Sequence, residues 1–208
     1  MASNLNLQMG ARNGAKQERN KYDFYATSPN AVRLFLNTLK KENKQLLNTT
    51  IWECACGNGH ISEVLKEYGY DVINSDIIKR EYDCFELDFL KATKKDRLKI
   101  YPNKFMDIMT NPPFKYAIEF TRKGLELLEN NEHLILFLKF RFLEGEQRLK
   151  LFREFNPEYV YVHSSRQKCA MNGEFEKYCK TSPTEFYSWF VFRKGYKGET
   201  ILKWIDYR

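Results

Sequence analysis

The sequence has few histidines and cysteines, and none of them forms a metal-ligand pattern. The 3 histidines are isolated from one another, and the 5 cysteines include no Cys-x-x-Cys pair. These residues are His60, His133 and His163, and Cys54, Cys56, Cys84, Cys169 and Cys179. This spacing gives no support to a zinc site, so we expect no metal and read the cysteines as free thiols.

The chain also lacks segments that direct a protein to a membrane or out of the cell. It contains no apolar run of membrane-spanning length, and its first residues do not resemble a signal peptide. Together with free thiols, these absences predict a reducing, cytoplasmic location and no membrane partner.

A further absence concerns dinucleotide binding. Gly57 and Gly59 follow an apolar, strand-like run, but the NAD fingerprint needs a third glycine where Ser62 stands. That fingerprint is therefore excluded. Apolar residues recur at helical spacing from Ile61 onward, so the segment still predicts a strand, a glycine loop and a helix. Glycines in such a loop let a ligand lie against the backbone.

Size and charge limit the function classes. A chain of 208 residues can form one α/β domain with a sizeable core, but not that domain plus a large recognition domain. The net charge of +7 favours a polyanionic partner such as nucleic acid, although an ordinary basic protein has the same charge.

Strand-like and helix-like segments alternate along the chain. Strands are expected near residues 49–55, 70–75, 84–87, 105–110, 133–138, 158–162 and 185–193, and helices from Pro29 and near 60–68, 117–128 and 146–155. This alternation predicts a doubly wound α/β fold whose mainly parallel sheet is covered on both faces. We expect residues 1–20 to be flexible and residues 21–208 to form one domain.

Acidic residues end three successive predicted strands. Glu53 can receive a ligand ammonium, and Asp76 is placed to accept the hydroxyls of a ribose. Asp88 can meet an adenine amino group, with Phe89 or Ile77 packing on the base. Any one of these acids could be a solvated strand end, but three in succession favour a nucleoside site at the carboxyl ends of the strands.

Asn111-Pro112-Pro113-Phe114 follows the next apolar strand and is the most informative motif. The prolines have no N–H and hold the backbone extended. The Asn111 side-chain oxygen and the Pro112 carbonyl can then accept the two hydrogens of an –NH2 group, while Phe114 offers a face for stacking. The motif therefore predicts a site that grips a flat, conjugated amine and presents its nitrogen to an electrophile. A proline-rich strand end with a buried phenylalanine is the alternative.

Taken together, these motifs resemble class I S-adenosylmethionine-dependent methyltransferases that act on amino groups. In particular, the chain is similar to the small adenine-N6 DNA methyltransferases of phages and prophages, from about Tyr22 to Trp204. The resemblance implies a Rossmann-like fold with a seven-stranded sheet and an antiparallel last strand. It also implies S-adenosylmethionine as cofactor, S-adenosylhomocysteine as product, and adenine N6 in DNA as acceptor, in a bacterial or phage-infected cell.

The resemblance also implies roles for individual residues. Residues 23–29 are similar to a Tyr-x-Thr-Pro element that closes over the methionine end of the cofactor, although Ser28 is inserted here. Ala55 stands where many relatives have a phenylalanine. The implied catalytic residues are Asn111, Pro112, Pro113 and Phe114. The implied cofactor-binding residues are Tyr25, Thr27, Glu53, Ala55, Gly57, Gly59, Asp76, Ile77, Asp88, Phe89 and Asn111.

The substrate side is expected in two segments, the loop at 164–183 and the turn after Phe140. Long loops inside compact domains are usually functional or disordered, so a mobile solvated loop is the alternative. Candidate substrate contacts are Phe114, Arg141, Arg148, Arg166, Gln167, Lys168 and Asn172. RNA adenine, cytosine N4, a protein glutamine amide, or a binding module without activity remain alternative functions.

Overall fold

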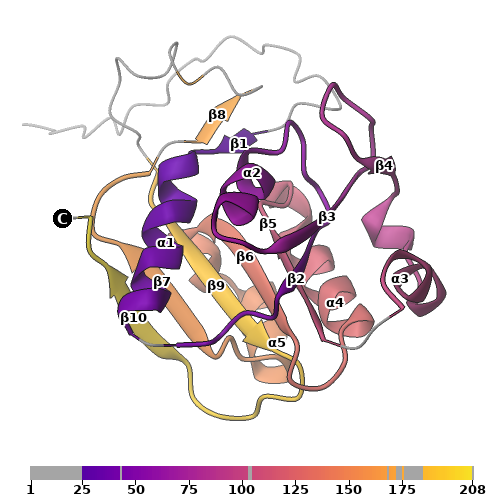
Figure 1. Cartoon of the computed structure of the whole chain (residues 1–208). Coiled ribbons are helices and arrows are strands. Elements are labelled where there is room, and N and C mark those ends of the chain that lie inside the picture. The colour runs from indigo at the N-terminus through magenta and orange to yellow at the C-terminus, as the bar shows by residue number, and fades with distance from the viewer. Residues whose placement is uncertain are drawn as a thin grey trace, which may run out of the picture.

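The computed structural model describes residues 25–42, 44–102, 105–167, 169–171, 175 and 185–207. The segment 1–20, expected to be flexible, lies outside the described residues, as does most of the stretch 172–184 in the expected recognition loop. The described residues build one large sheet with helices packed on it, and a small two-stranded sheet beside one of its ends (Figure 1).

The large sheet has eight strands in the order β10-β7-β9-β6-β5-β2-β3-β4. Their bounds are β2 Thr50–Glu53, β3 Asp71–Asp76, β4 Phe85–Glu86, β5 Met106–Thr110, β6 His133–Lys139, β7 Tyr159–His163, β9 Tyr187–Arg193 and β10 Ile201–Ile205. All neighbours are parallel except β9, which runs antiparallel to both β6 and β7. This confirms the predicted fold class, with β10 as an additional edge strand.

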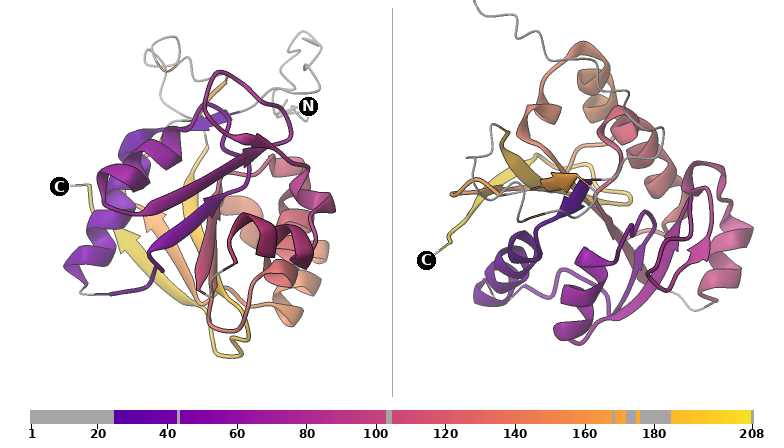
Figure 2. Two further views of the ribbon diagram at one scale, coloured as in Figure 1. Left: turned by 45° about the vertical axis from the view of Figure 1, so that its right-hand side comes forward. Right: turned by 90° about the horizontal axis from the view of Figure 1, so that it is seen from above.

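Helices cover both faces of this sheet, as the view from above shows (Figure 2). One face carries α1 (Pro29–Lys41) and α2 (His60–Glu67). The other carries the short helix η1 (Phe89–Lys91), α4 (Ala117–Leu127) and α5 (Glu146–Glu154). The helix α3 (Lys94–Ile100) follows η1. The remaining short helices, η2 (Phe114–Tyr116) and η3 (Phe140–Leu143), directly follow the Asn-Pro-Pro turn and β6.

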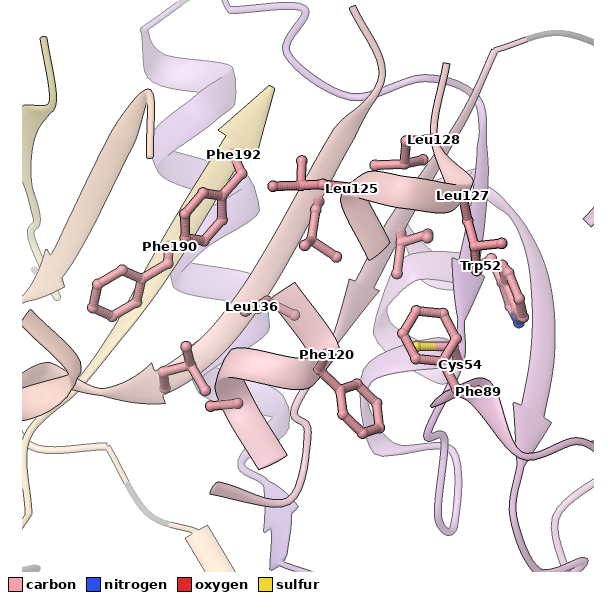
Figure 3. Close-up of a cluster of buried hydrophobic side chains, with 14 of the residues drawn as sticks. Trp52, Cys54, Phe89, Phe120, Leu125, Leu127, Leu128, Leu136, Phe190 and Phe192 are labelled. Carbon is pink, nitrogen blue, oxygen red and sulfur yellow. The ribbon is translucent and has the colours of Figure 1, made fainter. Parts of the chain in front are cut away.

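Alternate residues of the central strands supply two separate cores, as a period of two residues requires. Ile108 faces the α4 side, whereas Met109 faces the α1 side. On the α4 side, aromatic and aliphatic side chains pack tightly between β2, α4 and β9 (Figure 3). Trp52 and Phe89 are in edge-to-face contact there, with ring centroids 5.4 Å apart. Burial on both faces explains why these strands read as continuous apolar runs.

Three elements were not expected from the sequence. β1 (Tyr25–Thr27) pairs antiparallel with β8 (Cys169–Met171), which joins two segments far apart in the chain. The helix α3 is strongly polar, but a capping box between Thr93 and Asp96 marks its start. β10 lies at the sheet edge and is mostly exposed, so its sequence shows little apolar periodicity.

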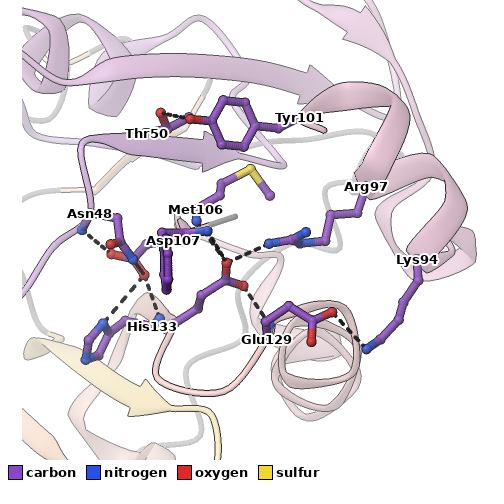
Figure 4. A network of polar contacts seen from close by, with 11 residues as sticks. Asn48, Thr50, Lys94, Arg97, Tyr101, Met106, Asp107, Glu129 and His133 are labelled. Carbon is purple, nitrogen blue, oxygen red and sulfur yellow. Dashed lines mark hydrogen bonds and ion pairs between the residues drawn. The ribbon is translucent and has the colours of Figure 1, made fainter. Parts of the chain in front are cut away.

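Buried acids at the other end of the sheet, where the parallel strands begin, are structural (Figure 4). Glu132 forms an ion pair of 2.6 Å with the buried Arg97 and accepts backbone N–H groups of Phe105, Met106 and Glu129. Asp107 accepts two bonds from Asn48 and one from the His133 backbone. These carboxylates accept backbone N–H groups near the starts of β5 and β6, at the end of the sheet opposite the candidate site.

Candidate functional site

The predicted site residues come together where the parallel strands end. Glu53 is the last residue of β2, Asp76 is the last of β3, and Asn111 follows the last residue of β5. Because these strands are parallel neighbours in the order β3-β2-β5, their ends lie side by side. The acids therefore lie on one side of Asn111, and β6 and β9 lie on the other.

The glycine loop between β2 and α2 is fixed to the end of β3. Its Gly57 N–H donates to Asp76 Oδ2 at 2.8 Å, and its Cys56 N–H donates to the Ser75 carbonyl at 3.0 Å. Gly59 has a φ of +75°, and a Cβ there would lie 2.3 Å from the Tyr82 ring. Glycine is thus required at 59 both by backbone conformation and by the Tyr82 ring that packs on it.

Glu53 lies beneath this loop and is 2% exposed. Its Oε2 accepts the Ser62 N–H near the start of α2 at 2.9 Å, and it also contacts the Ser62 hydroxyl. Burial raises the pKa of Glu53 to about 8 despite those bonds. The Ser62 hydroxyl also contacts Asn74 Oδ1, which is only an acceptor. A hydroxyl has one proton, so Ser62 can donate to only one of these two oxygens. If Ser62 donates to Asn74 Oδ1, a protonated Glu53 can donate to the Ser62 oxygen, and each contact then has one donor and one acceptor.

Asp76 is 7% exposed and accepts backbone N–H groups from both Gly57 and Ile78. Each carboxylate oxygen has a second lone pair, so Asp76 can still accept ligand hydroxyls. Asp88 caps η1 by accepting the Leu90 N–H at 3.1 Å, and its side chain is partly exposed.

The two side chains suggested for packing on a base differ sharply in accessibility. Phe89 is 3% exposed and packs inside the core against Trp52 and Phe120 (Figure 3), so it does not present a face to a ligand. Ile77 is 53% exposed at the end of β3. The structure therefore places Phe89 in the core and leaves the Ile77 side chain accessible. Ala55 in the glycine loop is half-buried.

The Asn111 side chain is oriented by β1. Its Nδ2 donates to the Tyr25 carbonyl at 2.7 Å. A carbonyl oxygen can only accept, so this bond fixes which end of the amide faces β1. Asn111 Oδ1 is buried and has no hydrogen-bond partner among the described residues, and the same is true of Thr27 Oγ1 in β1. An unsatisfied buried acceptor costs roughly 1–3 kcal/mol, and a donor from a ligand would remove that cost at Asn111.

The rest of the motif completes this acceptor site. The Pro113 carbonyl accepts the Tyr116 N–H at 2.8 Å, whereas no bond to the Pro112 carbonyl is found between described residues. The Phe114 ring stacks on Tyr25 with centroids 6.3 Å apart, and it lies 5.3 Å from Lys139 Nζ. Phe114 is only half-buried, so part of its ring remains available.

The substrate contacts expected from the sequence are placed unequally. Arg141 is exposed after β6, and Arg166 lies over the Phe186 ring at 4.7 Å. Arg148 is half-buried and donates to the Glu144 carbonyl at 2.6 Å, so it stabilises η3 as well as any phosphate.

Gln167 does not agree with its predicted role at base edges. It is 4% exposed, and its amide donates to the Ser165 carbonyl and hydroxyl, which fold the loop on itself. Lys168 and Asn172, the other two predicted contacts in this loop, lie outside the described residues.

Sequence reasoning missed Lys139 and Tyr187, which contact Phe114 from β6 and β9. Lys139 ends β6, so the rule that pointed to the ends of β2, β3 and β5 could have found it. Tyr187 begins an antiparallel strand, and nothing local indicates that its ring lies 5.8 Å from that of Phe114.

Across the described part of the chain, no three His, Cys, Asp or Glu side chains gather to hold a metal ion. None of the helices described has the length and apolar character needed to traverse a bilayer.

Comparisons with known proteins give a fold likeness but no sequence family. No protein-family model matches the chain, and no curated protein matches it in sequence. Among solved structures, a candidate hemolysin from Lactococcus lactis is similar with a TM-score of 0.59 and 13% identity, covering 82% of this chain and 89% of that one. A candidate class I S-adenosylmethionine-dependent methyltransferase from Listeria monocytogenes has a TM-score of 0.57 and 12% identity, covering 86% and 65%.

A third similar structure is the methyltransferase subunit of a type I restriction-modification system from Streptococcus thermophilus. Its TM-score is 0.59 and its identity is 15%, covering 90% of this chain but 48% of that subunit. The chain thus spans about half of that subunit's length. At these identities the likeness concerns the fold: the chain has the Rossmann-like fold of class I S-adenosylmethionine-dependent methyltransferases.

Proposed function

We propose that this protein is an S-adenosylmethionine-dependent methyltransferase that modifies the N6 amino group of adenine in nucleic acid, with DNA as the favoured substrate. The observation that supports this most strongly is the buried, unpartnered Asn111 Oδ1, held in place by the Tyr25 carbonyl. Pro112 and Phe114 belong to the same four-residue motif as Asn111. The +7 net charge agrees with a nucleic-acid partner.

The residues present fit the cofactor that the fold implies. Thr27 Oγ1 is buried without a partner in the described structure, and Asp76, which accepts the Gly57 N–H of the glycine loop, retains free lone pairs. Glu53 would meet the ammonium group, Asp76 the ribose, and Asp88 with Ile77 the adenine. When bound, S-adenosylmethionine supplies an electrophilic methyl group on a sulfonium.

The chain's own contribution to the reaction is to orient the acceptor amine. The lone pair of an exocyclic adenine nitrogen is conjugated into the ring, which makes it a poor nucleophile. Acceptance of its two N–H groups by Asn111 Oδ1 and the Pro112 carbonyl favours a tetrahedral nitrogen with a localised lone pair. Those fixed acceptors also stabilise the positive charge that develops on nitrogen. The cationic product amine is strongly acidic, so no strong general base is needed.

Positioning supplies much of the remaining rate. Effective molarity from alignment of two reactants can be worth roughly 7–11 kcal/mol. In duplex DNA the adenine must also leave the base stack, which costs a few kcal/mol. Stacking on Phe114, backed by Tyr25 and Tyr187, would offset part of that cost.

The test is methyl transfer from labelled S-adenosylmethionine to duplex DNA, single-stranded DNA, RNA and protein. We expect labelled N6-methyladenine, and we expect Asn111→Ala to lower transfer roughly 100- to 1,000-fold, by analogy with removal of one fixed charge-stabilising group. Cofactor binding by calorimetry should change little in Asn111→Ala and fall strongly in Asp76→Ala. Asn37→Ala, on the outer surface of α1, is the matched control.

The outcomes separate the proposal from its alternatives. Label on cytosine, RNA or a glutamine amide would keep the chemistry and change the acceptor. Cofactor binding without transfer to any substrate would favour a binding module that has lost activity. Near-normal turnover by Asn111→Ala would contradict the mechanism.

A further inference from the structure

A concave pocket of about 470 Å³ lies on the side of Asn111 away from Glu53 and Asp76. It has no role in the chemistry described above. Its lining residues are Phe140, Arg141, Leu143, Glu144, Glu185 and Phe186. Its volume falls in the range of roughly 300–1,000 Å³ that is typical of small-ligand sites. The pocket joins the end of β6 to the residues that lead into β9.

Two aromatic side chains with accessible faces form much of this pocket. Phe140 is 38% exposed and Phe186 is 52% exposed. The Phe140 N–H donates to the Phe186 carbonyl at 2.7 Å, so the two residues are fixed relative to each other. Exposed phenylalanines held rigidly in a concavity are suited to stacking a flat ring.

Cations surround these rings. The guanidinium of Arg166 lies 4.7 Å from the Phe186 ring centroid. Lys139 and Arg141 both approach Glu185, at 2.7 Å and 3.7 Å, and the Arg141 side chain is 64% exposed. Rings bordered by lysine and arginine are typical of sites that stack a base and contact its phosphate. An acidic protein partner would use the cations but would leave the two phenylalanine rings without a flat group to stack on them.

The position of the pocket relates it to the amine site. Lys139 both ends β6 at the pocket and lies 5.3 Å from the Phe114 ring. β5 and β6 are adjacent parallel strands, and neighbouring strands lie about 4.8 Å apart. A nucleotide next to the target base in the same DNA strand would therefore reach the pocket while it stays on the protein surface.

We propose that this pocket binds the base of the nucleotide that flanks the target adenine, stacked on Phe140 and Phe186, with Arg141 and Arg166 at its phosphate. The inference rests on the proposed function, since it needs a nucleic-acid substrate. It identifies a site of sequence preference within the catalytic domain itself, formed by β6, η3 and the residues before β9.

The test measures binding of labelled DNA duplexes with a mismatched central adenine, in which one flanking base at a time is replaced by an abasic residue. We expect one flanking position at which base removal weakens binding to the unaltered protein roughly 5- to 150-fold, as expected for loss of one stacked base. In Phe186→Ala and Phe140→Ala that same removal should have little further effect. Phe105→Ala, a phenylalanine 61% exposed at the opposite end of the sheet, should behave like the unaltered protein.

Methyl transfer is measured on the same duplexes, so that failure of the two proposals can be told apart. Transfer to adenine with identical abasic profiles in all variants would overturn the pocket and leave the proposed function standing. A pocket-dependent abasic profile without any transfer would support the pocket and overturn the activity. No binding of any duplex by the unaltered protein would overturn both.

Discussion

Replacing Glu53 with glutamine should stabilise the ligand-free protein above pH 5. Glu53 is 2% exposed, and burial raises its pKa from 4.5 to about 8. Below pH 4.5 the carboxyl is protonated in both folded and unfolded chains. Between pH 4.5 and about pH 8 the unfolded chain releases the proton and the folded chain keeps it. The stability that Glu53 contributes is therefore lost as pH rises from 4.5 through 8.

The magnitude follows from the pKa. One pKa unit corresponds to about 1.36 kcal/mol. With the folded pKa at about 8, Glu53 should lower the free energy of unfolding by roughly 3 kcal/mol at pH 7 and by up to about 5 kcal/mol at pH 8 and above. Glutamine has nearly the shape of the protonated carboxyl, and its oxygen in the place of Oε2 can still accept the Ser62 N–H and the Ser62 hydroxyl.

The assay is urea denaturation of both proteins from pH 5 to pH 9. The difference in unfolding free energy should grow in favour of Glu53→Gln up to about pH 8 and then level off. Glu63→Gln, on the exposed side of α2, is the control. Hydrogen bonds from Tyr82 and Lys66 lower the pKa of Glu63, so the stability that Glu63 contributes is lost only as pH falls below about 4.5. The difference between Glu63→Gln and the parent should therefore stay flat from pH 5 to pH 9. A difference between Glu53→Gln and the parent that is flat with pH would refute the reasoning.

The same carboxyl should make cofactor capture depend on pH. An ammonium group beside Glu53 favours the carboxylate, so binding of S-adenosylmethionine near pH 7 should release a proton. Calorimetry in buffers of different ionisation enthalpy measures that proton directly. We expect Glu53→Gln to bind more weakly and to release none, whereas equal proton release by both proteins would place the ionising group elsewhere.

Two further predictions concern the fold around the site and at the opposite end. Glu132→Gln leaves Arg97 buried beside a neutral partner and should lower the free energy of unfolding by roughly 3–5 kcal/mol in urea titrations. The control Lys94→Gln removes an exposed ion pair with Glu129 and should change that free energy by less than about 1 kcal/mol. Gly59→Ala should weaken cofactor binding and lower the free energy of unfolding, because residue 59 has a φ of +75° and an added Cβ would meet the Tyr82 ring. A second change, Tyr82→Ala, should relieve only part of this loss, since it removes the clash but not the backbone strain. Full relief would show that the backbone is not strained.

Much of the fold could be predicted because local patterns and global burial agree. β5 and β6 are buried on both faces and read as mainly apolar runs, and Pro112 and Pro113 follow closely after β5. β10 could not be predicted in this way, since only Ile205 of its five residues is buried. The pairing of β1 with β8 depends on residues more than 140 positions apart, and no local periodicity reports it.

The clustering of the candidate site residues was predictable from the sequence, but the direction in which each side chain points was not. The rule that ligands bind at the carboxyl ends of parallel strands placed Glu53, Asp76 and Asn111 together from the sequence alone. Burial of individual side chains follows from packing between distant elements, which the sequence does not show. Phe89 therefore turned into the core, and Gln167 turned onto its own loop.

Buried acids occur at both ends of this sheet, and their partners distinguish structural acids from functional ones. Glu132 is paired with Arg97 and accepts three backbone N–H groups, so its charge is fully compensated within the fold. Glu53 is equally buried, yet its described hydrogen-bond partner is Ser62 alone, and no cation forms an ion pair with it among the described residues. A buried carboxyl that is costly to ionise in the free protein would be stabilised in its charged form by a cation that arrives with a ligand. The asymmetry agrees with the proposed site at the carboxyl ends of the strands, where Glu53 would meet the ammonium group of the cofactor.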